Sequence, residues 1–149
     1  MSRDTAIRYY FAYGSNLCLD QMQRRCPGAR PAGVVRLDRH RLTFPLLSRT
    51  WGAGVAGIEP HETEFVEGVL YELTDDHFAS LDRYEGSYTR DVITVICPRR
   101  GEIEAMVYRP NRNDGPFAPS SEYLATMLRG AEAHGLSPAW IELLKRINA

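Results

Sequence analysis

This sequence of 149 residues has few features that point to a membrane, a nucleic acid or a secretion route. No uninterrupted apolar run approaches the ~20 residues that a membrane-spanning helix needs, and the opening residues lack the apolar core of a signal peptide. The net charge is −1 and the arginines are scattered, so electrostatics give no reason to expect a nucleic-acid partner. We therefore expect a cytoplasmic protein that binds neither membranes nor nucleic acids.

Cysteine and histidine are also scarce, and neither occurs in a metal-binding spacing. The three cysteines, Cys18, Cys26 and Cys97, form no C-x-x-C pair, and the four histidines show neither an H-x-x-x-H nor an H-E-x-x-H pattern. Zinc sites and redox pairs require such spacings. We expect buried or partly buried free thiols and no metal site.

The chain does contain enough apolar sequence for a single domain over residues 1–149. A domain of this length buries roughly 68–70% of its unfolded surface, so its core needs no metal or disulfide. The predicted element order is strand, helix, several strands, helix, two strands and two helices. Because helices and strands do not alternate regularly, a doubly wound parallel sheet is disfavoured. We predict the α+β class, as a small mixed, mainly antiparallel β-barrel flanked by helices.

Local patterns place these elements along the chain. Strands are expected at 8–13, 65–73, 88–97 and 102–108, and two extended segments at 33–37 and 41–44 flank a polar turn at 38–40. Pro45 interrupts any regular strand there. Helices are expected at 17–25 and, capped by Thr74, at 74–85, and two more begin near Ser120 or Ser121 and at Ser137-Pro138.

Glycine is concentrated at 51–58, which contains a literal G-x-G-x-x-G at Gly52, Gly54 and Gly57. A dinucleotide-binding fingerprint needs a helix after its glycines, and the following Ile58-Glu59-Pro60 offers none. We reject a nucleotide site and expect these glycines to mark close backbone approach, a bulge or a barrel corner.

The most informative stretch is residues 9–17, where an aromatic strand breaks at Gly14 and turns polar at Ser15 and Asn16 before a helix. Backbone N–H groups at such a turn converge, which suits a carboxylate, a phosphate or an oxyanion. The alternative is an ordinary strand-to-helix turn in which Ser15 or Asn16 caps the helix. These residues alone leave both interpretations open.

One acidic residue occupies an unusual place in the helix predicted at 74–85. Glu85 follows Phe78 by seven positions and Leu81 by four, so it projects from their apolar face. A carboxyl group that loses solvation there has a raised pKa and exchanges protons near neutral pH. The alternative is that Glu85, in the last turn, bends to solvent. Asp82 is turned further from the apolar stripe and is expected at a rim.

Two separated pieces of the chain match one family. Tyr10-Phe11-Ala12-Tyr13-Gly14-Ser15-Asn16-Leu17 and Leu81-Asp82-Arg83-Tyr84-Glu85-Gly86 resemble the γ-glutamylcyclotransferase-like (AIG2-like) superfamily, and the similarity covers about residues 9–144. The resemblance implies a small mixed barrel with flanking helices. It also implies an intramolecular aminolysis, in which the α-amino group of a γ-glutamyl compound attacks its own γ-amide carbonyl, forms 5-oxoproline and expels an amine.

By this resemblance Glu85 is the general acid/base, and no metal or organic cofactor is required. The expected partner is a small γ-glutamyl substrate, bound by a monomer or a homodimer. The link between Glu85 and Tyr88 is short, which predicts a more open pocket edge. The residues that the resemblance assigns to substrate binding are Tyr10, Phe11, Ala12, Tyr13, Gly14, Ser15, Asn16, Tyr88, Tyr108 and Tyr123.

The leading hypothesis is therefore a γ-glutamyl cyclotransferase acting on γ-glutamyl amines or γ-glutamyl amino acids. A variant of it removes a γ-glutamyl protecting group from a biosynthetic intermediate. The alternative is a non-catalytic binding or regulatory module that uses the same pocket, since a fold does not fix a function. A hydrolase with Ser15 as nucleophile is disfavoured, because the G-x-S-x-G elbow is missing and no histidine is placed to activate the hydroxyl.

Overall fold

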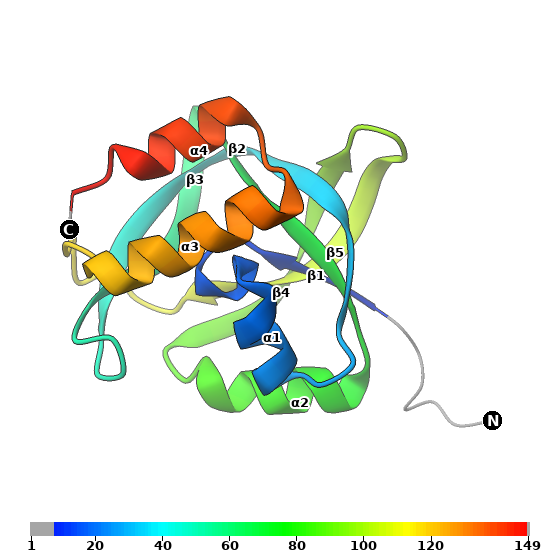
Figure 1. Ribbon diagram of the computed structural model, residues 1–149, viewed down its shortest axis with the longest axis horizontal. Coiled ribbons are helices and arrows are strands. Elements are labelled where there is room, and N and C mark those ends of the chain that lie inside the picture. Colours follow the sequence, from blue (N-terminus) through cyan, green and yellow to red (C-terminus); the bar gives the residue numbers. More distant parts are fainter. Residues whose placement is uncertain (1–7, 149) are drawn as a thin grey trace.

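The computed structural model describes residues 8–148 and shows a closed five-stranded barrel flanked by helices (Figure 1). Around the barrel the strand order is β1-β3-β2-β4-β5. β5 closes on β1 in a parallel pairing and the other neighbours are antiparallel, so the predicted mixed barrel is confirmed. The strands are β1 (Arg8–Ala12), β2 (Arg30–Ser48), β3 (Ala53–Leu73), β4 (Tyr88–Cys97) and β5 (Gly101–Pro110).

The two long strands β2 and β3 pair antiparallel and curve around the barrel (Figure 1). Their register shifts between residues 31 and 33, 38 and 40, and 43 and 46. The polar turn predicted at 38–40 is therefore wrong: the chain continues as a strand through a bulge, with Arg39 at a φ of 57°. Pro45 lies within another of the shifts, where a bulge tolerates a missing N–H donor. These bulges bend the strands enough to close the barrel.

The helices begin mostly where the sequence predicts. They are α1 (Leu19–Arg25), α2 (Asp75–Tyr84), α3 (Ser121–His134) and α4 (Pro138–Lys145), with a 3-10 helix, η2 (Ser15–Leu17), directly after β1. Thr74, Ser120 and Ser137 cap α2, α3 and α4 by accepting hydrogen bonds on their side chains. Within residues 8–148, no helix is long and apolar enough to cross a membrane.

The turn after β1 differs from the prediction of a capped helix. Ser15 and Asn16 lie inside η2, and α1 begins only after Cys18, whose side chain makes no capping hydrogen bond. The predicted cap at Ser15 or Asn16 is therefore wrong. Both side chains are buried, and their polar atoms are used in a network described below.

Helix α3 lies directly against η2. A Cβ added at Gly130 would lie 2.2 Å from the carbonyl carbon of Leu17 and 2.6 Å from the backbone nitrogen of Cys18. Only a glycine permits this approach, because a real Cβ does not come this close to a non-bonded atom. The buried core beneath includes Phe11, Leu17, Met22, Leu70, Phe78, Leu81 and Met127. The backbone of η2 is therefore held between α3 and the barrel.

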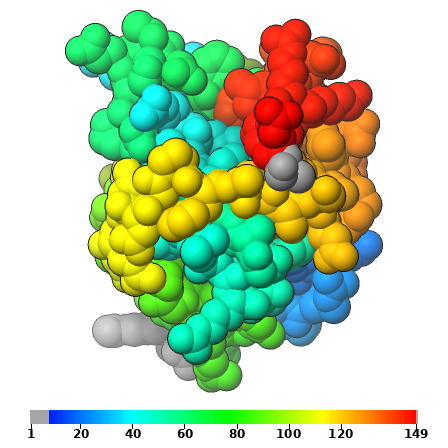
Figure 2. Space-filling model, turned by 90° about the vertical axis from the view of Figure 1, so that its left-hand side faces the viewer, coloured from blue at the N-terminus to red at the C-terminus, as the bar shows by residue number. Residues whose placement is uncertain are grey.

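The segment that joins β5 to α3, residues 111–119, crosses the outside of β2 and β3 (yellow in Figure 2). The Phe117 N–H donates to the carbonyl of Phe44 at 2.9 Å, and the Gly54 N–H donates to the carbonyl of Ala118 at 2.9 Å. A Cβ at Gly54 would lie 2.6 Å from the Phe117 carbonyl oxygen. Gly54 thus marks a close backbone approach, as predicted. Trp51 and Gly52 lie in the turn before β3, and residues 53–58 belong to this single long strand.

Candidate active site

A cavity of about 570 Å³ opens beside the turn that follows β1. Its wall combines this turn with the C-terminal end of α2, the start of β4, the end of β5, the first turn of α3 and the loop between β2 and β3. That volume suits a small molecule. The main lining residues are Tyr10, Tyr13, Gly14, Ser15, Asn16, Arg25, Trp51, Ala56, Glu85, Tyr88, Tyr108 and Tyr123.

The turn at Gly14 brings the backbone to the cavity because it carries no side chain there. A Cβ on Gly14 would lie 2.9 Å from the hydroxyl oxygen of Tyr123 and 3.3 Å from the Cβ of Ala56. The turn is fixed from behind, since the Tyr71 hydroxyl donates to the carbonyl of Asn16 at 2.9 Å. Its position is therefore determined by contacts on both sides.

The side chains of this turn form a buried polar network. Gln21 Nε2 donates to Ser15 Oγ at 2.8 Å and to Asn16 Oδ1 at 2.9 Å. Asn16 Nδ2 donates to the Tyr10 hydroxyl oxygen at 2.9 Å and contacts Glu85 Oε1 at 3.5 Å. Among the described residues that line the cavity there is no histidine, so its wall holds no imidazole to activate Ser15 as a nucleophile.

Glu85 follows the last residue of α2 and lies in the cavity wall. Phe78 and Leu81 of the same helix are fully buried, so the carboxyl group lies beside the core and is itself partly buried. Loss of solvent raises the pKa of Glu85 from its ordinary value of 4.5 to about 7, against an opposing effect of the Arg25 charge. Near neutral pH this group both accepts and returns a proton.

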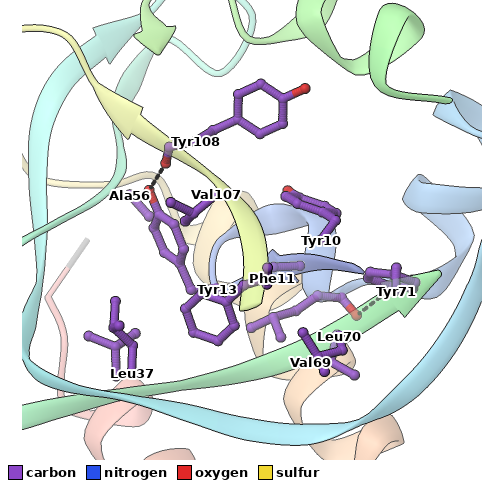
Figure 3. Packing of buried hydrophobic residues seen from close by; sticks show 14 of the residues in the cluster. Tyr10, Phe11, Tyr13, Leu37, Ala56, Val69, Leu70, Tyr71, Val107 and Tyr108 are labelled. Carbon is purple, nitrogen blue, oxygen red and sulfur yellow. Dashed lines mark hydrogen bonds between the residues drawn. The ribbon is translucent and has the colours of Figure 1, made fainter. Parts of the chain in front are cut away.

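Tyrosine hydroxyls connect the strands around the cavity. Tyr13 donates to the carbonyl of Tyr108 at 2.7 Å (Figure 3), and Tyr108 donates to Asp82 Oδ1 at 2.6 Å. Asp82 also lies 3.4 Å from an Arg90 nitrogen and is exposed, and it is not among the residues that line the cavity. These two hydroxyl protons are used for structure and are not available to a ligand.

The remaining tyrosines converge on Ala56 and Asn16. Tyr88 donates to the Ala56 carbonyl at 2.5 Å, while the Tyr123 hydroxyl oxygen accepts from the Ala56 N–H at 3.0 Å. Tyr10 accepts from Asn16, which leaves its own proton free to point into the cavity. Burial raises the pKa of Tyr10 well above its ordinary value and that of Tyr123 to about 12, so both stay neutral donors.

The structure brings most of the predicted site residues together. Two do not reach the cavity: Phe11 and Ala12 are completely buried and belong to the core, where the Phe11 ring packs near Tyr13 (Figure 3). The structure therefore gives their assignment to substrate binding no support, because β1 is covered on both faces and these two side chains pack in the core.

Two further residues of the site, Gln21 and Arg25, were not predicted. Both lie on α1, four positions apart, and therefore on one face of the helix. That spacing was visible in the sequence, but the direction of the face was not. Trp51 of the β2–β3 loop also lines the cavity, and its ring lies edge-on to Tyr123 at 5.0 Å.

These features define a class of protein. The barrel supports a polar, aromatic-lined cavity of small-molecule size, and one partly buried carboxyl group with a raised pKa lies in its wall. Such a combination is typical of a site for acid–base chemistry on a small molecule.

Comparison with known proteins identifies the family. Residues 10–125 match the model described as "Gamma-glutamyl cyclotransferase, AIG2-like". Gamma-glutamylcyclotransferase of Bos taurus is 31% identical over 156 residues, covering 99% of this chain and 81% of that protein. The protein of the same name from Homo sapiens is 33% identical over 148 residues, covering 93% and 78%. The chain therefore belongs to the AIG2-like γ-glutamylcyclotransferase family.

Solved structures agree with this assignment. One named "Gamma-glutamyl cyclotransferase" superposes with a TM-score of 0.92 at 30% identity, covering 96% of this chain and 89% of that one. YkqA from Bacillus subtilis superposes with a TM-score of 0.80 at 25% identity, covering 95% of this chain and 54% of that one.

Proposed function

We propose that this protein is a γ-glutamyl cyclotransferase that releases 5-oxoproline and a free amine or amino acid from γ-glutamyl compounds. The observation that carries the proposal is Glu85, a partly buried carboxyl group with a pKa raised to about 7, which lies in the wall of a cavity of small-molecule size, 3.5 Å from the Asn16 amide of the turn after β1. Relatives named Gamma-glutamylcyclotransferase, which match 93–99% of this chain, support it.

In this proposal the turn after β1 holds the glutamyl part of the substrate. The backbone N–H groups of Gly14 and Ser15 bind the α-carboxylate or the developing oxyanion, because converging amides suit an anion. The free Tyr10 proton adds a neutral donor in the same wall. Tyr88 and Tyr123 shape the pocket around Ala56, and Tyr108 forms part of the wall beside Asp82.

The reaction needs one group that moves a proton twice. The Glu85 carboxylate takes a proton from the substrate's α-ammonium group, and the amine nitrogen then forms a bond to the γ-carbonyl carbon. The resulting tetrahedral intermediate carries its negative charge on the former carbonyl oxygen. Glu85 gives this proton to the leaving nitrogen as the carbon–nitrogen bond breaks. The regenerated carboxylate then takes the second proton from the ring nitrogen, which becomes the lactam N–H, and passes it to the released amine or to solvent. Folding the substrate into a five-membered approach supplies much of the rate through proximity.

The chemistry uses no metal and no organic cofactor, and we propose that it takes place in the cytoplasm. Glu85 is the proposed catalytic residue. The proposed substrate-binding residues are Tyr10, Tyr13, Gly14, Ser15, Asn16, Tyr88, Tyr108 and Tyr123.

The test is a mass-spectrometric assay for 5-oxoproline across γ-glutamyl amines and γ-glutamyl amino acids, with the Glu85→Gln protein in parallel. We expect release by the wild type only, and the best substrate names the leaving group. Absence of release from every compound contradicts the proposal and favours a binding module with the same pocket.

A further inference from the structure

The amide group of Asn16 is directed by residues on helix α1. Gln21 Nε2 donates to its oxygen at 2.9 Å, and Arg25 Nη1 donates to the same oxygen at 3.1 Å. A guanidinium group carries only donors, so the amide atom that faces Arg25 has to be the oxygen. The NH₂ group of Asn16 is thereby turned toward the Tyr10 hydroxyl and the Glu85 carboxyl.

Arg25 is itself held in place. Its guanidinium carbon lies 4.6 Å from the centroid of the Tyr84 ring, immediately before Glu85 in the sequence. Arg25 therefore links α1 to the C-terminal end of α2. It donates to Asn16, whose NH₂ group faces Glu85, and it packs on Tyr84, the residue before Glu85. Cation–π contacts of this kind fix a guanidinium group that otherwise has many rotamers.

We propose that Arg25 is a positioning residue that orients the Asn16 amide, so that a neutral N–H donor and a nearby positive charge both face Glu85. This inference rests on the proposed role of Glu85 as acid/base. Arg25 acts through Asn16 and is not assigned a contact with the substrate. In this hydrogen-bond chain, Arg25 and Gln21 donate to Asn16 Oδ1, and Asn16 Nδ2 in turn donates toward Tyr10 and Glu85.

To attribute a change in the pKa of Glu85 to Arg25, the charge states of the other groups that face Glu85 have to be known. The tyrosines around it come from β1 and the turn after it, β4, β5 and α3, and burial raises the pKa of each, so they are neutral at pH 7: Tyr10, Tyr13, Tyr88, Tyr108 and Tyr123. Asp82 is engaged with Tyr108 and Arg90. The Arg25 charge lowers the pKa of Glu85, and Arg49 and Arg112 line the outer cavity wall.

The test compares Arg25→Leu with Arg25→Lys and with a matched control, Arg24→Leu. Arg24 precedes Arg25 on α1 and is exposed, so its replacement removes the same charge without touching the network. We expect Arg25→Leu to lower kcat about 10-fold with little change in KM, because a hydrogen-bonded partner of the site is lost. The acid limb of its kcat/KM–pH profile should move to higher pH, because the Arg25 charge that lowers the pKa of Glu85 is gone. Arg25→Lys keeps the positive charge and should return the acid limb to its wild-type pH. Arg24→Leu should match the wild type in both kcat and pH profile.

A double-mutant cycle tests whether Arg25 acts through Asn16. If it does, Arg25→Leu adds little to the loss of kcat caused by Asn16→Ala. Additive losses, a change in KM alone, or an equal effect of Arg24→Leu would overturn the inference. Activity is not the only measurement: in the folded proteins, the Asn16 side-chain ¹⁵N resonance should follow the titration of Glu85 in the wild type and lose this response in Arg25→Leu. An unchanged response contradicts the inference.

The same set of proteins distinguishes this failure from failure of the proposed function. An inactive wild type, or a fully active Glu85→Gln protein, removes the acid/base role. An active wild type, an inactive Glu85→Gln protein and an Arg25→Leu protein indistinguishable from wild type remove only the role of Arg25.

Discussion

The two sides of the cavity are built differently. On the inner side, Tyr10, Ser15 and Asn16 are only 4%, 8% and 4% exposed, and their polar atoms are bonded to one another or to Gln21. On the outer side, Leu47 is 59% and Tyr84 is 56% exposed. The inner side is fixed by the packing of η2 between α3 and the barrel, whereas the outer side is formed by the ends of β2 and α2 and the loops that follow them.

This difference suggests that the two sides of the cavity bind different parts of the substrate in the proposed reaction. A rigid, hydrogen-bonded wall suits the part of the ligand that is the same in every substrate, because its donors are ordered before the ligand binds. An open rim of exposed side chains sets few constraints on what lies beside it. We infer that the inner side binds the glutamyl group and that the outer side accommodates the leaving amine. The following predictions test this distinction.

The largest effect is expected at Glu85, on the inner side. Glu85→Gln should lower turnover by about 10² to 10⁴-fold, the usual contribution of a positioned acid or base, while the fold and ligand binding persist. Steady-state kinetics together with calorimetric binding of a γ-glutamyl compound provide the measurement. Asp76→Asn, which removes an exposed carboxylate from the first turn of the same helix, is the control. A Glu85→Gln enzyme with full activity contradicts the acid/base assignment.

The same substitution should stabilise the protein at high pH. Because the folded-state pKa of Glu85 is raised from 4.5 to about 7, ionisation in the folded state is unfavourable. The cost is absent below pH 4.5, develops between pH 4.5 and 7, and amounts to roughly 3 kcal/mol above that. Denaturant unfolding at pH 5 and pH 8 should therefore show a gain for Glu85→Gln mainly at pH 8. An equal gain at both values would show that burial of the charge is not the cause.

Crowding the inner turn should reduce ligand binding by at least about 10-fold. The first added carbon of Gly14→Val falls 2.9 Å from the Tyr123 hydroxyl oxygen, so either the turn or the ring has to move. Gly86→Val is a matched control, since no atom lies within 4 Å of an added Cβ there and Gly86 also lines the cavity. Calorimetry with one γ-glutamyl compound compares the two. Equal affinities would remove the turn from the binding site.

The smallest effects are expected at the outer rim. Leu47→Ala and Arg49→Ala should change KM only about two- to five-fold, and by amounts that depend on the leaving amine, because exposed contacts contribute little. The affinity for 5-oxoproline, which lacks that amine, should stay constant. A uniform loss across all substrates would mean that the rim also holds the glutamyl group.

Much of the fold follows from local sequence, and its failures have physical causes. The caps of α2, α3 and α4 and the hairpin of β4 and β5 depend on neighbouring residues, and they were predicted correctly. The turn expected at 38–40 failed because a bulge and a turn share the same polar sequence, and only pairing with β3 separates them. Residues 59–64, for which no strand was predicted, also belong to β3.

The site shows the same limit. The helical period placed Glu85 on the apolar face, which agrees with its position in the cavity wall. The period could not show that Gln21 and Arg25 face the turn after β1, because that depends on how α1 packs. Nor could it exclude Phe11 and Ala12, since covering both faces of β1 is a property of the closed barrel.

The central claim is that burial prepares Glu85 to exchange a proton during the reaction. The most direct measurement is a ¹³C titration of the Glu85 carboxyl group, assigned by its loss in Glu85→Gln, beside the pH dependence of kcat/KM in the same buffer. Our account predicts a carboxyl pKa of about 7 and an acid limb of the kcat/KM profile at the same pH. A carboxyl group that titrates near 4.5, or an acid limb that does not follow it, would contradict the account.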